Sequence, residues 1–153
     1  MIDTREDILA RLVLIVESIP NIRSAQRNNV DIPEDQLPAA IILDGDEETA
    51  DSTDSSMRPP HRPTMVTMTP GIVVQVQDDN VMLGSMITTF RRELIKGILF
   101  DIQLNEQIVK TGRFGNGAIR YLGCQTDVGW TRTGYAALTA QFQFKYALKP
   151  DQL

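Results

Sequence analysis

The chain has 153 residues, of which 42% are hydrophobic and 23% are charged, a composition typical of one globular domain. It contains no run of about 18 apolar residues, so no membrane-spanning helix is expected. Its polar, acidic first residues do not resemble a signal peptide. The only cysteine is Cys124, which excludes an intramolecular disulfide and favours a reducing compartment. We therefore expect a soluble protein made in the cytosol.

The net charge of −5 is unevenly distributed along the chain. Residues 1–57 carry 13 acidic and four basic side chains, whereas residues 110–149 carry six basic side chains and one acidic side chain. This asymmetry predicts an acidic face and a basic face. Two interpretations stay open: both faces are solvated surface, or they meet as complementary patches on two copies of the chain.

The first predicted element is a helix over residues 4–19. Asp3 or Thr4 can cap its first turn, and Pro20 stops it. Its apolar side chains recur at helical spacing; they include Ile8, Leu12, Ile15 and Ile19.

Two predicted strands follow, a short one over residues 22–27 and a buried one over the apolar run 39–43. The composition then changes abruptly, because residues 44–63 are acidic, rich in Ser and Thr, and end in prolines. Such a segment buries too little apolar surface to offset its ordering entropy. We therefore expect a long mobile loop within one domain, cut first by protease at residues 45–62.

The middle of the chain predicts strands over residues 64–69 and 72–77, separated by Pro70-Gly71. Either a tight turn or a bulge in one long strand would accommodate this dipeptide. A second amphipathic helix is predicted over residues 81–100, and residues 101–109 are predicted to form a loop or a brief helical turn.

The last third is predicted to be β-structure. A strand over residues 117–127 turns Ile119, Tyr121 and Leu122 inward, and a turn at 129–134 carries Trp130. The strongest pattern is residues 135–146, where apolar and polar side chains alternate as in a strand with one wet face. The predicted fold is α+β: one domain over residues 1–153, with a mostly antiparallel sheet, two amphipathic helices on one face and a long acidic loop.

No arrangement of residues predicts catalysis, a metal site or a cofactor. The only histidine, His61, lies in the Pro-rich loop, where nothing would hold it rigidly beside a nucleophile. The acidic run starting at Asp44 fails the EF-hand spacing. The glycines of residues 112–117 precede a strand, whereas phosphate-binding loops precede a helix. The negative net charge also disfavours nucleic-acid recognition.

The order of elements resembles that of the tail terminator proteins of long-tailed bacteriophages. The resemblance covers most of the chain and is a matter of layout and size. It rests on these segments: the N-terminal helix, the strand Leu37–Leu43 followed by the acidic loop, the pair of strands in Pro63–Gln77, the 81–100 helix, the strand Ile119–Gly123, and the terminal Phe142–Tyr146 strand.

This resemblance implies a non-enzymatic virion protein of the tail neck, assembled in the host cytoplasm. Members of the family form a ring, usually a hexamer, that caps the tail tube, ends its polymerisation and offers a surface to the head connector or stopper. The implied partners are further copies of the chain, the tube protein and the connector, and DNA passes through the lumen.

The physical interpretation names candidate interaction residues of its own. A ring needs contact between two unlike patches, which the two charge clusters supply, and the acidic loop 44–56 could line the lumen and repel DNA. Trp130 is either a core residue or an interface anchor. The full set is Asp46, Glu47, Glu48, Asp51, Asp54, Arg113, Arg120, Trp130 and Arg132. The alternatives are another ring-forming neck or tail protein, such as a stopper or tail-completion factor, or a small bacterial enzyme or ligand-binding domain.

Overall fold

A computed structural model of the chain describes residues 3–49, 64–77, 82–111, 118–128 and 134–153. Its helices and strands, in chain order, are α1 (Thr4–Glu17), β1 (Ser24–Arg27), the 3-10 helix η1 (Glu34–Gln36), β2 (Ala39–Thr49), β3 (Thr64–Gln77), α2 (Leu83–Leu99), α3 (Ile102–Val109), β4 (Ile119–Val128), β5 (Tyr135–Leu148) and the 3-10 helix η3 (Pro150–Gln152). None of these helices is both long and apolar enough to cross a bilayer.

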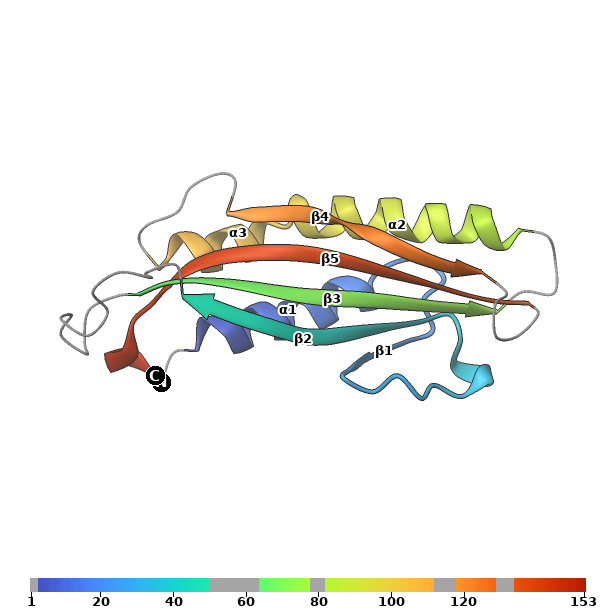
Figure 1. Cartoon of the computed structure of the whole chain (residues 1–153), viewed down its shortest axis with the longest axis horizontal. Coiled ribbons are helices and arrows are strands. Elements are labelled where there is room, and N and C mark those ends of the chain that lie inside the picture. The colour runs from blue at the N-terminus through green and yellow to red at the C-terminus, as the bar shows by residue number, and fades with distance from the viewer. Residues whose placement is uncertain (1–2, 50–63, 78–81, 112–117, 129–133) are drawn as a thin grey trace.

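Within the described residues, the five strands form one sheet in the order β1-β2-β3-β5-β4 (Figure 1). Only β1 and β2 run parallel, and every other pair is antiparallel. The long strands β3 and β5 lie at the centre, with 14 residues each. The predicted α+β class with a mostly antiparallel sheet is confirmed.

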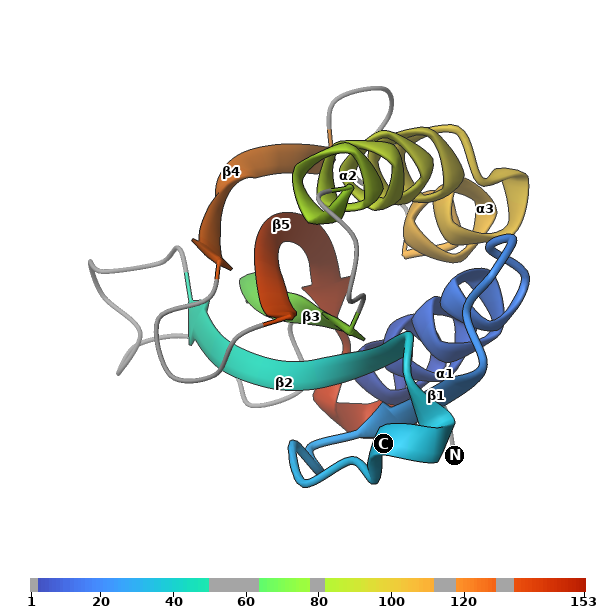
Figure 2. The same ribbon diagram turned by 90° about the vertical axis from the view of Figure 1, so that its right-hand side faces the viewer.

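All three α-helices lie on one side of the curved sheet (Figure 2). The core forms between them and one face of the sheet, and α1 alone buries Ile8, Leu9, Leu12, Ile15 and Val16. In β5 the predicted alternation is confirmed, because every second side chain is fully buried: Leu138, Ala140, Phe142, Phe144 and Tyr146.

The third helix corrects the prediction for residues 101–109. These residues form the two-turn helix α3 instead of a loop or a brief turn. The Asp101 carboxylate accepts a hydrogen bond from the Leu104 backbone N–H at 2.9 Å, which caps the helix. Leu104 and Ile108, four residues apart, are buried against the core. A cap and one apolar pair are enough for a helix this short once a core exists to receive it.

The dipeptide Pro70-Gly71 lies inside a single continuous strand. The β3–β5 register is the same before it, where Met68 pairs with Phe144, and after it, where Gly71 pairs with Gln141. Because proline has no N–H to donate, the ladder is interrupted there without a change of register. Of the two predicted alternatives the long strand is correct, although the bulge at this point lies in the neighbouring strand β2, between Leu43 and Asp46.

The acidic stretch after Leu43 corrects the predicted loop over residues 44–63. Strand β2 continues through residues 44–49 to Thr49, paired with β3, and it carries a β-bulge between Leu43 and Asp46. In this stretch Asp44 is half-buried and residues 45–49 are exposed. An edge strand needs only backbone pairing on one side, so an acidic composition does not prevent it. Residues 50–63, the rest of the predicted loop, lie outside the described residues.

A second bulge in β4 explains another correction. It lies between Tyr121 and Gly123, and Leu122, predicted to face inward, is 44% exposed because it is the extra residue. The register places Leu43, Gly71, Gln141 and Gly123 in one row across four strands. Both bulges therefore adjoin a single transverse line, along which the sheet bends.

Candidate interaction surface at the sheet edges

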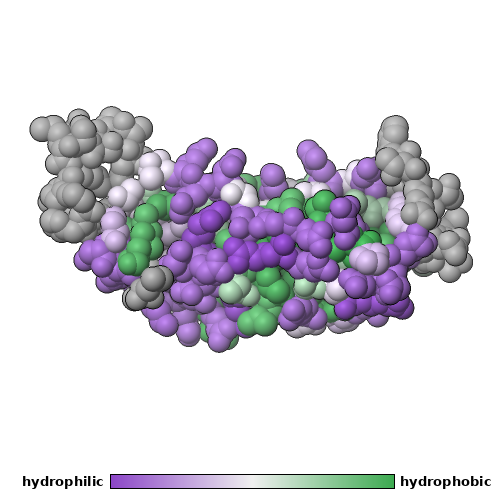
Figure 3. Space-filling model, turned by 90° about the horizontal axis from the view of Figure 1, so that it is seen from below, coloured by the Kyte–Doolittle hydropathy of each residue, from purple (hydrophilic) through white to green (hydrophobic). Residues whose placement is uncertain are grey.

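The acidic end of β2 places Asp46, Glu47 and Glu48 at the border of the sheet, where all three are exposed. The register decides which way each side chain points. Asp46 and Glu48 pair with Thr69 and Thr67 on the face without α-helices, called here the outer face. Figure 3 views the molecule from the β1–β2 side; the surface seen there is mostly hydrophilic, with hydrophobic side chains in several separate groups.

Glu47 points to the opposite face of the sheet, in register with Met68. Its carboxylate accepts a hydrogen bond from the hydroxyl of Tyr146, whose side chain is fully buried. Burial, and then this hydrogen bond, raise the pKa of Tyr146 far above its ordinary value, so the phenol stays protonated. Glu47 therefore joins β2 to the core, while its two neighbours face solvent.

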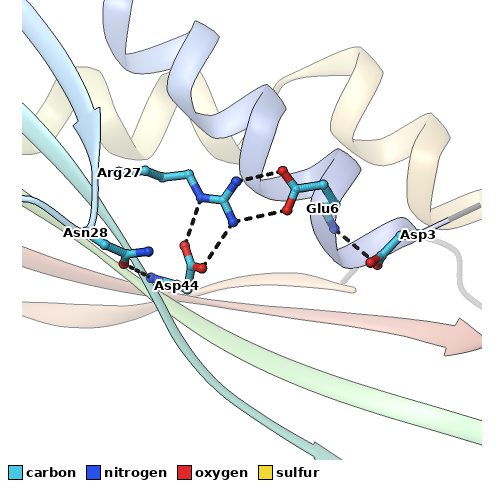
Figure 4. A network of polar contacts seen from close by, with 5 residues as sticks. All are labelled: Asp3, Glu6, Arg27, Asn28 and Asp44. Atoms are coloured by element: carbon cyan, nitrogen blue, oxygen red, sulfur yellow. Dashed lines mark hydrogen bonds and ion pairs between the residues drawn. The ribbon is translucent and has the colours of Figure 1, made fainter.

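An arginine at the end of β1 holds the bulge of β2 in place (Figure 4). Arg27 binds Asp44 through Nε at 3.0 Å and Nη2 at 3.1 Å, and Glu6 of α1 through Nη1 at 2.7 Å. Asn28 Oδ1 accepts from the backbone N–H of Asp44 at 3.1 Å, and the Arg5 guanidinium donates to the Gly45 carbonyl at 3.4 Å. The network thus ties α1, β1 and β2 together where β2 becomes an edge.

Replacing Arg27 with glutamine should destabilise the protein in a pH-dependent way. The Arg27 guanidinium lowers the pKa of both Asp44 and Glu6. Depressed carboxyl pKa values stabilise the folded state above the unfolded pKa, near 4, and this stabilisation disappears as pH falls through the folded pKa. The loss at pH 7 should be about 1–2 kcal/mol, above the 0–1 kcal/mol of exposed pairs because the contacts are bidentate.

Urea unfolding at pH 7 and near pH 2 measures this difference. Wild type and Arg27→Gln should converge at the lower pH. Arg23→Gln is the control, because Arg23 only donates a long 3.5 Å bond to a backbone carbonyl. A destabilisation equal at both pH values would contradict the assignment.

The opposite border of the sheet is β4, which pairs with β5. Arg120 is exposed and pairs with Gln143 on the outer face. Since the β3–β5 register is unchanged across Pro70, Gln143 lies opposite Thr69, which pairs with Asp46. Asp46 and Arg120 therefore occupy the same row at the two borders, separated by three strand spacings, or roughly 14 Å.

Both borders have open backbone edges in the described part of the chain. Strand β1 pairs only with residues 39–42 of β2, which leaves Asp46–Thr49 without a strand on that side. Strand β4 has β5 on one side only, and Arg91 of α2 lies over the ring of its Tyr121, at 5.6 Å from the centroid. Such edges are templates for further strand pairing.

The other predicted interaction residues lie outside the described residues, so the structure does not place them. They are Asp51, Asp54, Arg113, Trp130 and Arg132. Among the candidates, the structure thus brings Asp46, Glu47 and Glu48 together on one edge and sets Arg120 on the other.

Sequence analysis missed an apolar corner where α2 meets α3. Phe100 is 78% exposed, Ile102 is 73% exposed and Val109 is 54% exposed. They line a shallow depression together with Ile119, the first residue of β4. The available signal was that Phe100 falls outside the apolar stripe of the helix predicted over residues 81–100. The corner adjoins the β4 edge at Ile119, and exposed apolar groups that cluster in this way mark interaction sites.

Residues suited to metal binding do not converge in the described ranges. No three His, Cys, Asp or Glu side chains there gather closely enough to hold a metal ion. Cys124 is partly buried on the helix-facing side of β4. His61 lies outside these ranges.

Comparison with solved structures finds distant structural likeness. No family model matches the chain, and no curated protein matches it. A solved structure that it resembles is described as the virion of a native gene transfer agent (GTA) particle. The TM-score is 0.44 and the identity is 11%, over 94% of this chain and 92% of the other.

Proposed function

We propose that the chain is a structural subunit of a phage-like virion, a tail terminator that assembles into a ring on the end of the tail tube. The observation that carries the proposal is the pair of open sheet edges, one acidic and one bearing Arg120, aligned in one row. A contact between unlike patches on successive copies generates a ring when the rotation closes. The resemblance in element order supports the same assignment.

The shape of the sheet fits a ring that surrounds a channel. Where residues 30–36 do not cover it, the outer face carries polar side chains from the central strands, including Thr67, Thr69, Gln141, Gln143 and Lys145. If the bulky helices lie outside, this polar face lines the lumen. Six copies with four strands each, at about 4.8 Å spacing, make a sheet roughly 115 Å around and roughly 37 Å across.

In this proposal the ring ends polymerisation of the tube and presents its other surface to the head connector or stopper. DNA passes through the lumen without sequence-specific contacts. Exposed ion pairs contribute only about 0–1 kcal/mol each, so apolar contacts supply most of the affinity, and charge sets register and speeds association. No chemical step is required of the protein.

Sedimentation and electron microscopy of the purified chain test the ring. We expect particles with about six times the 17.1 kDa subunit mass and a central hole. Added to polymerising tube protein of the same virion, they should bind one tube end and stop growth. A chain that stays monomeric at high concentration would contradict intrinsic self-assembly, and rings that leave tube growth unchanged would contradict the terminator role.

The charge contribution has its own expected result. The simultaneous change of Arg113, Arg120 and Arg132 to Glu should leave the monomer folded and weaken the ring. Salt near 1 M should slow assembly of the wild type, because the Debye length falls to about 3 Å. Lys110→Glu together with Lys149→Glu, which alter net charge away from β4, form the control. If neither high salt nor the triple change affects ring assembly, the proposed contribution of charge is wrong.

A further inference from the structure

The two open edges have matching directions. Strands β2 and β3 are antiparallel, as are β3 and β5, and β5 and β4. It follows that β2 and β4 run in opposite directions. If a second copy sits beside the first in the same orientation, the start of β4 in one copy faces the free Asp46–Thr49 stretch of β2 in the next as an antiparallel pair, whereas β1 occupies that side of β2 over residues 39–42. Each added copy leaves the same two edges free, so the pairing continues around a ring.

The faces of the sheet also match across such a junction. One row of paired residues, Glu47–Met68–Phe144–Ile119, crosses the four strands and faces the helices. The next row ends in Asp46 on one border and Arg120 on the other, both on the outer face. Placing two copies edge to edge therefore brings acidic and basic side chains together on one face.

We infer that residues Asp46–Thr49 of β2 in one copy pair with residues Ile119–Tyr121 of β4 in the next, as an antiparallel inter-subunit ladder. The inference rests on the proposed ring and names its interface. On the outer face Arg120 lies beside Asp46 or Glu48. Asp46 and Glu48 are two residues apart on the same face of β2. Which of them lies opposite Arg120 depends on the offset along the strands between neighbouring copies, which is fixed when the sheet closes into a barrel. The neighbouring copy also shields the apolar corner at Phe100 and Ile102, which adjoins Ile119.

Disulfide trapping tests the ladder in a Cys124→Ser chain. Two double variants carry Arg120→Cys with Asp46→Cys or with Glu48→Cys. A third, Arg120→Cys with Glu47→Cys, is the matched control, because position 47 points to the other face. Directly opposed residues have Cβ atoms about 4.5–5.5 Å apart, close to disulfide geometry. Mild oxidation followed by a non-reducing gel reads the result, and sedimentation of each reduced variant reports whether it assembles.

We expect at least one of the first two variants to give a ladder of covalent oligomers, and the control to stay monomeric on the gel. Variants with a single new cysteine should give no covalent dimer, because a head-to-tail contact never brings identical positions together. Rings that form without any trapped ladder, or with equal trapping at positions 46, 47 and 48, would overturn the ladder and leave the ring standing. Dimers from one cysteine would show a two-fold contact and overturn the ladder. Chains that do not assemble would overturn the ladder and the ring together.

Discussion

Replacing Phe144 with alanine should lower the free energy of unfolding by about 3–5 kcal/mol. The side chain is fully buried at the centre of the sheet, in register with Met68 on one side and Ile119 on the other. Removing the phenyl group of Phe144 leaves a cavity between β5 and the helices. The packed strands on both sides of β5 hinder the collapse of this cavity. Urea unfolding of both proteins at the same protein concentration measures the loss.

The matched control is Gln141→Ala in the same strand. Gln141 is exposed and points to the outer face, so its truncation should change stability by no more than about 0.5 kcal/mol. A loss below about 1 kcal/mol for Phe144→Ala would mean that the wrong face of β5 had been assigned to the core. Fixed concentration matters, because assembly adds to the apparent stability of a subunit.

Replacing Gly45 with alanine should destabilise the protein by at least about 2 kcal/mol. Gly45 has a φ of +71°, a left-handed conformation that side chains with a Cβ rarely adopt. A Cβ built there would lie 2.1 Å from the Thr69 carbonyl oxygen, which belongs to the paired backbone of β3. The bulge would have to shift, and the hydrogen bonds beside it would change with it.

Gly84→Ala provides the control with the same chemical change. Gly84 lies in the first turn of α2, and a Cβ there meets nothing within 4 Å. Alanine should therefore stabilise this position by up to about 1 kcal/mol, through higher helix propensity and a less flexible unfolded chain. Thermal or urea unfolding should show opposite signs for the two variants. Equal effects would contradict the role of the bulge.

The same bulge links stability to the proposed interface. It adds one residue to β2 between Leu43 and Asp46, which sets the face on which each later side chain lies. Without it, Asp46 and Glu48 would point toward the helices and Glu47 toward the outer face. Loss of the bulge should therefore impair assembly as well as folding.

The amino-acid sequence by itself determined the elements whose signals are local. The alternation of Leu138 to Tyr146 requires one dry face whatever else packs there, and the apolar stripe of residues 8–19 requires a core-facing helix. Patterns of this kind were enough to predict the α+β class and most of the buried residues. The charge asymmetry was also determined by the sequence, because it follows from counting the acidic and basic residues in each part of the chain.

Only the tertiary structure decided how residues 44–49 fold and where the charged edges lie. Those residues form a strand because β3, about 20 positions further on, offers its backbone to them, and no local composition reports the presence of such a partner. The same holds for Leu122, displaced by a bulge that exists only in pairing with β5. The alignment of Asp46 with Arg120 passes through four strands in register. Such an alignment depends on contacts between distant segments, which the order of residues in the chain does not display.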